Sequence, residues 1–121
     1  MPDDDAHQKR LQQHGLILLA SKLCIGPDRL PVRHATREEA HNVSDSGWIL
    51  ASGNESPEYA NNPDNFVMVP MDRMVATDVS LTILYDQPVG TELTRKTPEE
   101  PWRWIIDNKV VDEDGRVIAT H

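Results

Sequence analysis

The chain has 121 residues, enough for one domain whose core needs neither disulfides nor a metal. Twenty acidic residues against twelve basic ones give a formal net charge of −8, which repels phosphate backbones and makes nucleic acid a poor partner. The same charge favours a basic protein or a cationic ligand as a partner. An equally favoured interpretation is that the acidity only maintains solubility.

The single cysteine, Cys24, excludes an internal disulfide, and no apolar run approaches the roughly 20 residues of a membrane span. The acidic segment Met1–Asp5 has no apolar signal-peptide core. We therefore expect a cytoplasmic protein with no membrane partner. Residues 1–13 predict a flexible tail in which Ala6–Gln13 can become helical, and residues 14–121 predict a single domain.

The chain after the tail begins with an apolar run, Leu16–Leu23, bounded by turn residues. This pattern is typical of a central strand buried on both faces. Pro31–Ala35 predicts a second, short strand. Thr36–Glu39 resembles a helix capping box, because Glu39 stands three residues after the threonine, and predicts a helix of barely two turns.

The stretch Val43–Asn65 is rich in turn signals. It begins with the tripeptide Asp45-Ser46-Gly47, which predicts a turn because Asp and Ser side chains bond nearby backbone N–H groups and Gly tolerates positive φ. Trp48–Ala51 then predicts a strand. Because side chains alternate along a strand, Trp48 and Leu50 are expected to pack inward on one face.

The same stretch continues with a short helical turn. Ser56 is placed as its N-cap and Pro57 at its first helical position. Asn62-Pro63 ends the turn, because the residue before a proline is driven out of the α region. We expect the short polar side chains of Asp45, Asp64 and Asn65 to fix these loops by occupying backbone donors.

The middle of the chain predicts a strand at Phe66–Val69 and a short helix at Met71–Ala76, with Met71, Met74 and Val75 on one face. Residues 79–86 fit two patterns. Their apolar residues alternate as in a strand, which propensity favours, and they also match helical spacing after Asp78. Spacing alone leaves both structures open.

The last third predicts a strand at Thr91–Arg95 and a proline-rich loop at 96–101. Trp102–Val111 and Arg116–Thr120 are β-rich arms around Asp112–Gly115. An Asp-Gly pair between such arms is a strong hairpin signal.

Candidate chemistry is sparse. His34, His41 and Asp45 could meet on a folded loop as a metal site or a small hydrolase centre, but their spacing matches no compact zinc signature, and solvated loop histidines are the favoured interpretation. Cys24 could serve as a nucleophile, although a cysteine at the end of an apolar strand is usually an inert buried thiol.

Two acidic or amide-rich segments, Asn61–Asn65 and Asp112–Gly115, offer oxygen ligands for calcium. Neither contains the twelve-residue calcium loop with a closing Glu that an EF-hand needs, so the favoured explanation is that these residues form turns. Trp48, Trp102 and Trp104 are candidate interface anchors, although packing in the core is the commoner fate of tryptophan.

Several of these motifs occur together in one order along the chain. They are Leu18–Lys22, Asp45-Ser46-Gly47-Trp48, Ser52-Gly53-Asn54-Glu55, Glu58-Tyr59, Asn62-Pro63-Asp64-Asn65 and Pro88-Val89-Gly90-Thr91. In this order they resemble a small bacterial domain, the immunity proteins of polymorphic toxin systems, type thirty-three. The resemblance covers roughly residues 16–97 and leaves Trp102–His121 beyond it. It also favours a helix over residues 79–86.

The resemblance implies a non-enzymatic cytoplasmic protein that binds and silences a cognate toxin, with no cofactor, no metal and no catalytic residue. Charge favours a basic toxin, and a homodimer stays open. The alternatives are a housekeeping binding or regulatory module and, less favoured, a small metal-dependent hydrolase. The candidate binding residues are Trp48, Glu55, Glu58, Tyr59, Trp102 and Trp104, and the candidate structural residues are Asp45, Gly47, Asp64, Asn65 and Gly90.

The predicted fold is α+β, with a mainly antiparallel sheet of about five to seven strands, two or three short helices and a C-terminal β-hairpin. The segment after residue 101 could supply partner specificity or only cover an edge of the sheet.

Overall fold

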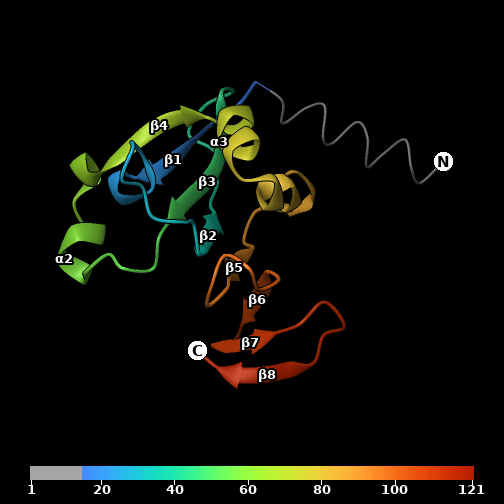
Figure 1. Cartoon of the computed structure of the whole chain (residues 1–121). Coiled ribbons are helices and arrows are strands. Elements are labelled where there is room, and N and C mark those ends of the chain that lie inside the picture. Colours follow the sequence, from blue (N-terminus) through green and yellow to red (C-terminus); the bar gives the residue numbers. More distant parts are fainter. Residues whose placement is uncertain (1–14) are drawn as a thin grey trace.

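The computed structural model describes residues 15–121, so the expected tail of residues 1–13, with its helix at Ala6–Gln13, lies outside the described part of the chain. Within this range eight strands form one sheet in the order β4-β1-β3-β2-β5-β6-β7-β8 (Figure 1). The strands are β1 (Ile17–Ser21), β2 (His34–Arg37), β3 (Asp45–Ala51), β4 (Phe66–Pro70), β5 (Glu92–Thr94), β6 (Arg103–Ile106), β7 (Lys109–Val111) and β8 (Val117–Thr120).

The predicted α+β class is confirmed, and the sheet is mainly antiparallel: only β1 and β3 pair in parallel among the described strands. Within the described residues the sheet has eight strands, not five to seven, because the arm expected at Trp102–Val111 forms two strands instead of one. The helical segments are α2 (Pro57–Ala60) and α3 (Met71–Thr77), with three 3-10 helices, η1 (Lys22–Cys24), η2 (Pro63–Asn65) and η3 (Val79–Asp86).

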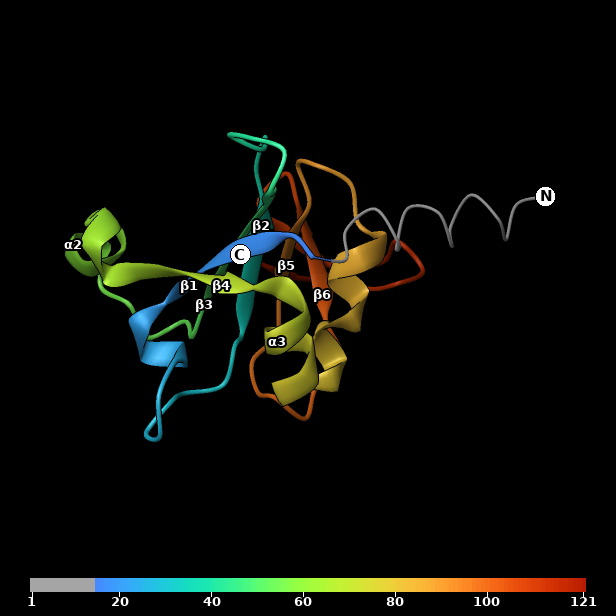
Figure 2. The ribbon, with the colours of Figure 1, turned by 90° about the horizontal axis from the view of Figure 1, so that it is seen from above.

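The core lies between one face of the sheet and the pair α3 and η3, which lie together at one side of the strands in Figure 2. Every second residue of the central strands points into this core. The buried members from the sheet are Leu18, Ala20, Ala35, Trp48, Leu50, Val69 and Leu93, and those from the helices are Met71, Met74, Leu81, Leu84 and Tyr85.

The apolar run at the start of the described chain forms an interior strand, β1, as predicted. Its burial alternates, however: Leu18 and Ala20 are fully buried, whereas Ile17 and Leu19 are half-buried on the opposite face. The expectation of burial on both faces is wrong, because α3 and η3 both pack on the other side of the sheet.

The capping box expected at Thr36–Glu39 is not a helix, and the strand expected at Pro31–Ala35 lies further along, as β2. Thr36 stands opposite Ile49 of β3 on one side and Glu92 of β5 on the other. Backbone pairing with two neighbouring strands therefore prevails over a local capping signal.

Residues Asp45–Gly47 belong to β3 instead of forming a separate turn before it. Ile17 and Leu19 of β1 stand opposite Asp45 and Ile49 of β3, so two steps along β1 span four along β3. This irregularity is a bulge, and Gly47 makes it possible by adopting a φ of +84°.

The other helix predictions are confirmed. Ser56 Oγ accepts a hydrogen bond from Tyr59 N at 3.1 Å, so Ser56 is the N-cap of α2 as expected. Met71 and Met74 of α3 are buried in the core. Residues 79–86 form the 3-10 helix η3, and Asp78 caps it by accepting from Ser80 N at 3.1 Å.

The C-terminal segment departs from its prediction in one respect. Trp102–Val111 is not a single arm: Asp107 (φ 52°) and Asn108 (φ 62°) form a two-residue turn between β6 and β7. Positive φ at both positions is the requirement of a type I′ hairpin turn, which Asp and Asn tolerate. The predicted hairpin around Asp112–Gly115 is present and joins β7 to β8.

The far end of the sheet curls back. β8 is four strands from β2 in the sheet order, which in a flat sheet is about 19 Å at about 4.8 Å per strand. Yet the ring of His121, just after β8, stacks on the ring of His34 in β2 with centroids 6.5 Å apart. The hairpin β7–β8 therefore folds over the sheet face that α3 and η3 leave open.

Candidate functional site

The bulge in β3 is held by Asp45. Its carboxylate accepts hydrogen bonds from His41 N at 3.0 Å and from Gly47 N at 2.9 Å. Burial would raise the pKa of Asp45, but these hydrogen bonds outweigh it and hold the pKa below its usual value. A Cβ on Gly47 would lie 2.0 Å from Glu38 O, so this position requires glycine. Both residues shape the backbone.

Glu55 closes the turn after β3. Its carboxylate accepts from Ser52 N, Ser52 Oγ and Gly53 N, each at 2.9 Å. Burial raises the pKa of Glu55, and hydrogen bonds from Ser52 and Ser21 lower it further than burial raises it. Arg33 braces the same turn by donating from Nε to Ser52 O at 2.7 Å. A carboxylate with this many internal donors organises the loop.

The segment that follows faces outward. Glu58 and Asp64 are exposed, and Tyr59 is half-buried. Asn65 Nδ2 donates to Tyr59 O at 3.0 Å, which ties the end of α2 to the start of β4. Asp64 contributes to the loop through its backbone: its N–H donates to Asn62 Oδ1 at 3.0 Å.

The three tryptophans are turned inward to different degrees. Trp48 is fully buried, and its Nε1 donates to Leu84 O at 3.1 Å. Trp102 is 6% exposed, and Trp104 is half-buried with its Nε1 donating to Gln87 Oε1 at 3.1 Å. Trp48 therefore packs in the core beside Leu50, as expected, and Trp102 and Trp104 line the core further along the sheet.

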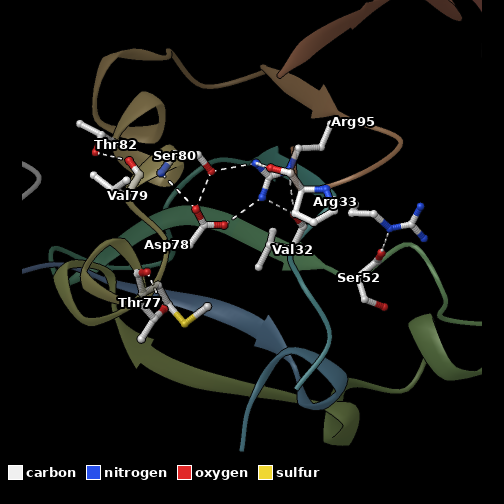
Figure 3. A network of polar contacts seen from close by, with 11 residues as sticks. Val32, Arg33, Ser52, Thr77, Asp78, Val79, Ser80, Thr82 and Arg95 are labelled. Atoms are coloured by element: carbon white, nitrogen blue, oxygen red, sulfur yellow. Dashed lines mark hydrogen bonds and ion pairs between the residues drawn. The ribbon is translucent and has the colours of Figure 1, made fainter. Parts of the chain in front are cut away.

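A buried arginine, Arg95, is the centre of a polar network (Figure 3). It is 4% exposed, and its guanidinium donates to Val32 O at 2.7 Å, to Asp78 Oδ2 at 2.9 Å and to Ser80 Oγ at 2.8 Å. The guanidinium carbon also lies 4.2 Å from the ring centroid of Trp102. Nothing in the spacing of Thr91–Arg95 signals this role.

The candidate metal and nucleophile residues do not converge. His41 Nδ1 lies 3.2 Å from Asp45 Oδ2 in an exposed loop, while His34 in β2 pairs with Glu92 at 3.1 Å. Across residues 15–121 no cluster of three or more His, Cys, Asp or Glu side chains could hold a metal ion. Burial, and secondarily the charge of Glu55, raises the pKa of the Cys24 thiol to about 12, so the thiol is protonated at neutral pH.

A cavity of about 590 Å³ lies under the curled C-terminal hairpin. Its wall combines apolar and charged side chains from the end of β5, the loop after it and the last three strands. The lining residues are Thr94, Arg95, Lys96, Glu100, Pro101, Arg103, Val110, Ile118, Ala119, Thr120 and His121. Sequence reasoning did not predict this cavity, because it depends on the curl of the sheet.

Comparison with protein families matches the immunity protein Imm33 domain over residues 19–105. The chain belongs to the Imm33 family. This confirms the resemblance seen in the sequence. Neither a search of curated proteins nor a search of solved structures gave a match.

The Imm33 match runs from β1 into β6 and ends at Ile105. It therefore includes the bulge, the Glu55 turn, α2 and the Arg95 network. The strands β7 and β8, which form the curled hairpin over the cavity, lie outside it. No helix among residues 15–121 is long and apolar enough to cross a membrane.

Proposed function

We propose that this Imm33 protein is a non-enzymatic immunity protein that binds a cognate toxin and neutralises it by stoichiometric binding. The observation that carries the proposal is the family match over residues 19–105, which covers most of the described sheet and the described helices α2 and α3. We further propose that it acts in the cytoplasm, as one domain over residues 14–121, without a cofactor and without nucleic acid or membrane as a partner.

The distribution of charge supports a basic toxin. Two arginines direct their guanidinium groups inward to backbone oxygens: Arg37 to Gln87 O at 2.6 Å, and Arg95 to Val32 O. Their positive charge is thereby directed away from the outer surface, where acidic side chains are exposed. The exposed acidic residues are Asp28, Glu38, Glu39, Glu58, Asp64, Asp86, Glu99, Glu100, Asp107, Glu113 and Asp114.

An acidic surface of this kind speeds encounter with a basic protein at low salt and discriminates against acidic ones. The proposal of a basic toxin therefore predicts an association rate that falls steeply with ionic strength, since exposed charges are screened beyond about 10 Å at 0.1 M salt.

The test is protection of growing cells. The toxin domain encoded beside this chain's gene is induced in a host that carries either this protein or an immunity protein of another family as control. We expect growth only with the cognate protein. Equal killing in both strains, with this protein folded and abundant, would contradict the proposal, as would the consistent lack of a toxin gene beside this one.

A further inference from the structure

The cavity under the C-terminal hairpin lies over one face of the sheet. Thr94 in β5 stands opposite Arg103 in β6, and Ile105, on the same face of β6, stands opposite Val110 in β7. Val110 in turn stands opposite Ala119 in β8. Because residues that stand opposite each other share a face, these side chains all project to the side that α3 and η3 leave open. The curl of the sheet makes this face concave, and the cavity occupies it.

The cavity is also bounded at its sides. Lys96, Glu100 and Pro101 line it from the loop after β5. His121 lines it from the end of the hairpin and stacks on His34 of β2, which holds the curl closed. The volume of about 590 Å³ is within the range of about 300–1,000 Å³ that is typical of small-molecule sites. A space bounded in this way suits a small molecule better than a folded partner.

The charged residues of the lining reverse the balance of the chain. The whole sequence has 20 acidic and 12 basic residues. Among the described residues, the charged lining consists of the basic side chains Arg95, Lys96 and Arg103 and the acidic side chain Glu100. The charge of Arg95 is already balanced by Asp78 at 2.9 Å. Lys96 and Arg103 therefore supply the positive charge that an incoming ligand meets.

Arg103 can accept an anion although it already has a partner. Its Nη1 lies 3.3 Å from Glu113 Oε2, and the Glu113 side chain is 64% exposed. An exposed ion pair of this kind contributes little stability, so a ligand can replace it at little cost. A guanidinium also presents five N–H donors in a planar fork that matches a carboxylate.

The rest of the lining is largely apolar. Val110, Ile118, Ala119 and Pro101 contribute aliphatic groups. Ile118 is 51% exposed, so a ligand seated here would remove apolar surface from water. A molecule that matches both parts of the lining carries a negative charge on an apolar body. Burial of the body supplies affinity, and the cations fix the orientation of the charged group.

We propose that this cavity is a binding site for a small organic anion, a carboxylate on an apolar body, whose charge is held by Lys96 and Arg103. The inference goes beyond the proposed immunity function and does not rest on it. The Imm33 match ends at Ile105, whereas β7 and β8, which form one wall of the cavity, follow it. The site is thus built partly from a segment that the family model does not cover.

The test titrates three probes into the full chain by calorimetry. Octanoate carries both the carboxylate and an apolar chain, octanamide keeps the chain without the charge, and acetate keeps the charge without the chain. Because the site uses both parts, we expect octanoate to bind at least about tenfold more tightly than octanamide or acetate. Octanoate should also raise the thermal midpoint of the protein, and the other two probes at the same concentration should not.

Substitutions of the cations test which residues hold the charge. Lys96→Gln and Arg103→Gln should each weaken octanoate binding by at least about threefold, because each removes one charge-assisted contact. Lys109→Gln is the matched control and should change binding by less than about twofold. Lys109 is next to Val110 in β7, so its side chain points to the opposite face of the sheet. Thermal midpoints without ligand check that the variants are folded.

Hydrogen exchange locates the site without any substitution. With octanoate bound, the amides of Lys109–Val111 and Val117–Thr120 should exchange more slowly, while those of Phe66–Pro70 in β4 should keep their rates. Protection at β4 in place of the hairpin would overturn the inference.

The titrations can overturn the inference in three further ways. The first is octanoate binding no tighter than octanamide or acetate, and the second is an equal effect of the lining and control substitutions. The third is a short acidic peptide that binds at the same residues more tightly than octanoate, which would assign the cavity to a peptide. None of these results bears on the immunity function.

Discussion

Replacing the buried arginine, Arg95→Leu, should destabilise the fold more than any surface change. Val32 O would lose the donors Nε and Nη2 at 3.0 and 2.7 Å, and an unsatisfied buried acceptor costs about 1–3 kcal/mol. The stacking on Trp102 adds about 0.5–2 kcal/mol. Asp78 is about one-third exposed, so its lost ion pair adds no more than about 1 kcal/mol.

These contributions together predict a loss of about 3–5 kcal/mol, the range typical of breaking a buried ion pair. The assay is equilibrium unfolding in urea, followed by tryptophan fluorescence. Arg103→Leu is the matched control, because it removes an exposed pair with Glu113 at 3.3 Å and should cost less than about 1 kcal/mol. Equal losses in the two variants would refute the assignment of Arg95 as the polar centre of the core.

Three further predictions concern stability. Trp48→Ala should lower the free energy of unfolding by about 3–5 kcal/mol, and Trp48→Phe by about 1–3 kcal/mol, because the phenylalanine leaves the buried carbonyl of Leu84 in η3 without its donor. Trp102→Phe should lower it less than Trp48→Phe, because no described residue accepts a hydrogen bond from Trp102 Nε1. Equal losses in the two phenylalanine variants would contradict this. Gly47→Ala should cost more than about 2 kcal/mol in thermal unfolding, but Gly115→Ala only about 1, because both have positive φ and only the first meets a backbone atom. The lowered pKa of Glu55 means that the unfolded state binds more protons, so the free energy of unfolding should fall as the pH drops below about 4.5. This fall should be less steep in the Glu55→Gln variant. Identical pH profiles of the wild type and the variant would contradict the role of Glu55.

Much of the fold could be predicted where local chemistry and tertiary pairing agree. Ser56 before Pro57 defines the start of α2 by a side-chain cap and a fixed φ, and both act within one turn. The Asp114-Gly115 pair likewise defines the turn of the hairpin β7–β8. The helix at 79–86 needed the family resemblance, because its apolar spacing fits a strand as well.

The errors arise where distant strands override a local signal. Thr36 carries a good N-cap side chain, but β3 and β5 both pair with its backbone, so the segment is a strand. The turn at Asp107-Asn108 was missed because the β-rich residues on both sides read as one arm, although Asp and Asn tolerate positive φ.

The candidate site was predictable in part. Asp45, Gly47 and Asn65 were expected to shape loops. Asp45 accepts a hydrogen bond from Gly47 N, Gly47 leaves room for Glu38 O, and Asn65 donates to Tyr59 O. The use of Glu55 as an acceptor for its own turn could have been suspected from its position two residues after Gly53. The cavity under the C-terminal hairpin could not, because it arises only when the sheet curls by enough to bring His121 onto His34.

The most direct test of the immunity function is the stoichiometry of the complex with the toxin domain encoded beside the gene. Purified full-length protein and toxin are mixed and measured by light scattering coupled to size exclusion, at low and at high salt. We predict a complex of fixed stoichiometry, whose formation abolishes the toxin's activity and slows as salt rises. Separate elution of the two proteins at low salt, with the toxin fully active, would contradict the account.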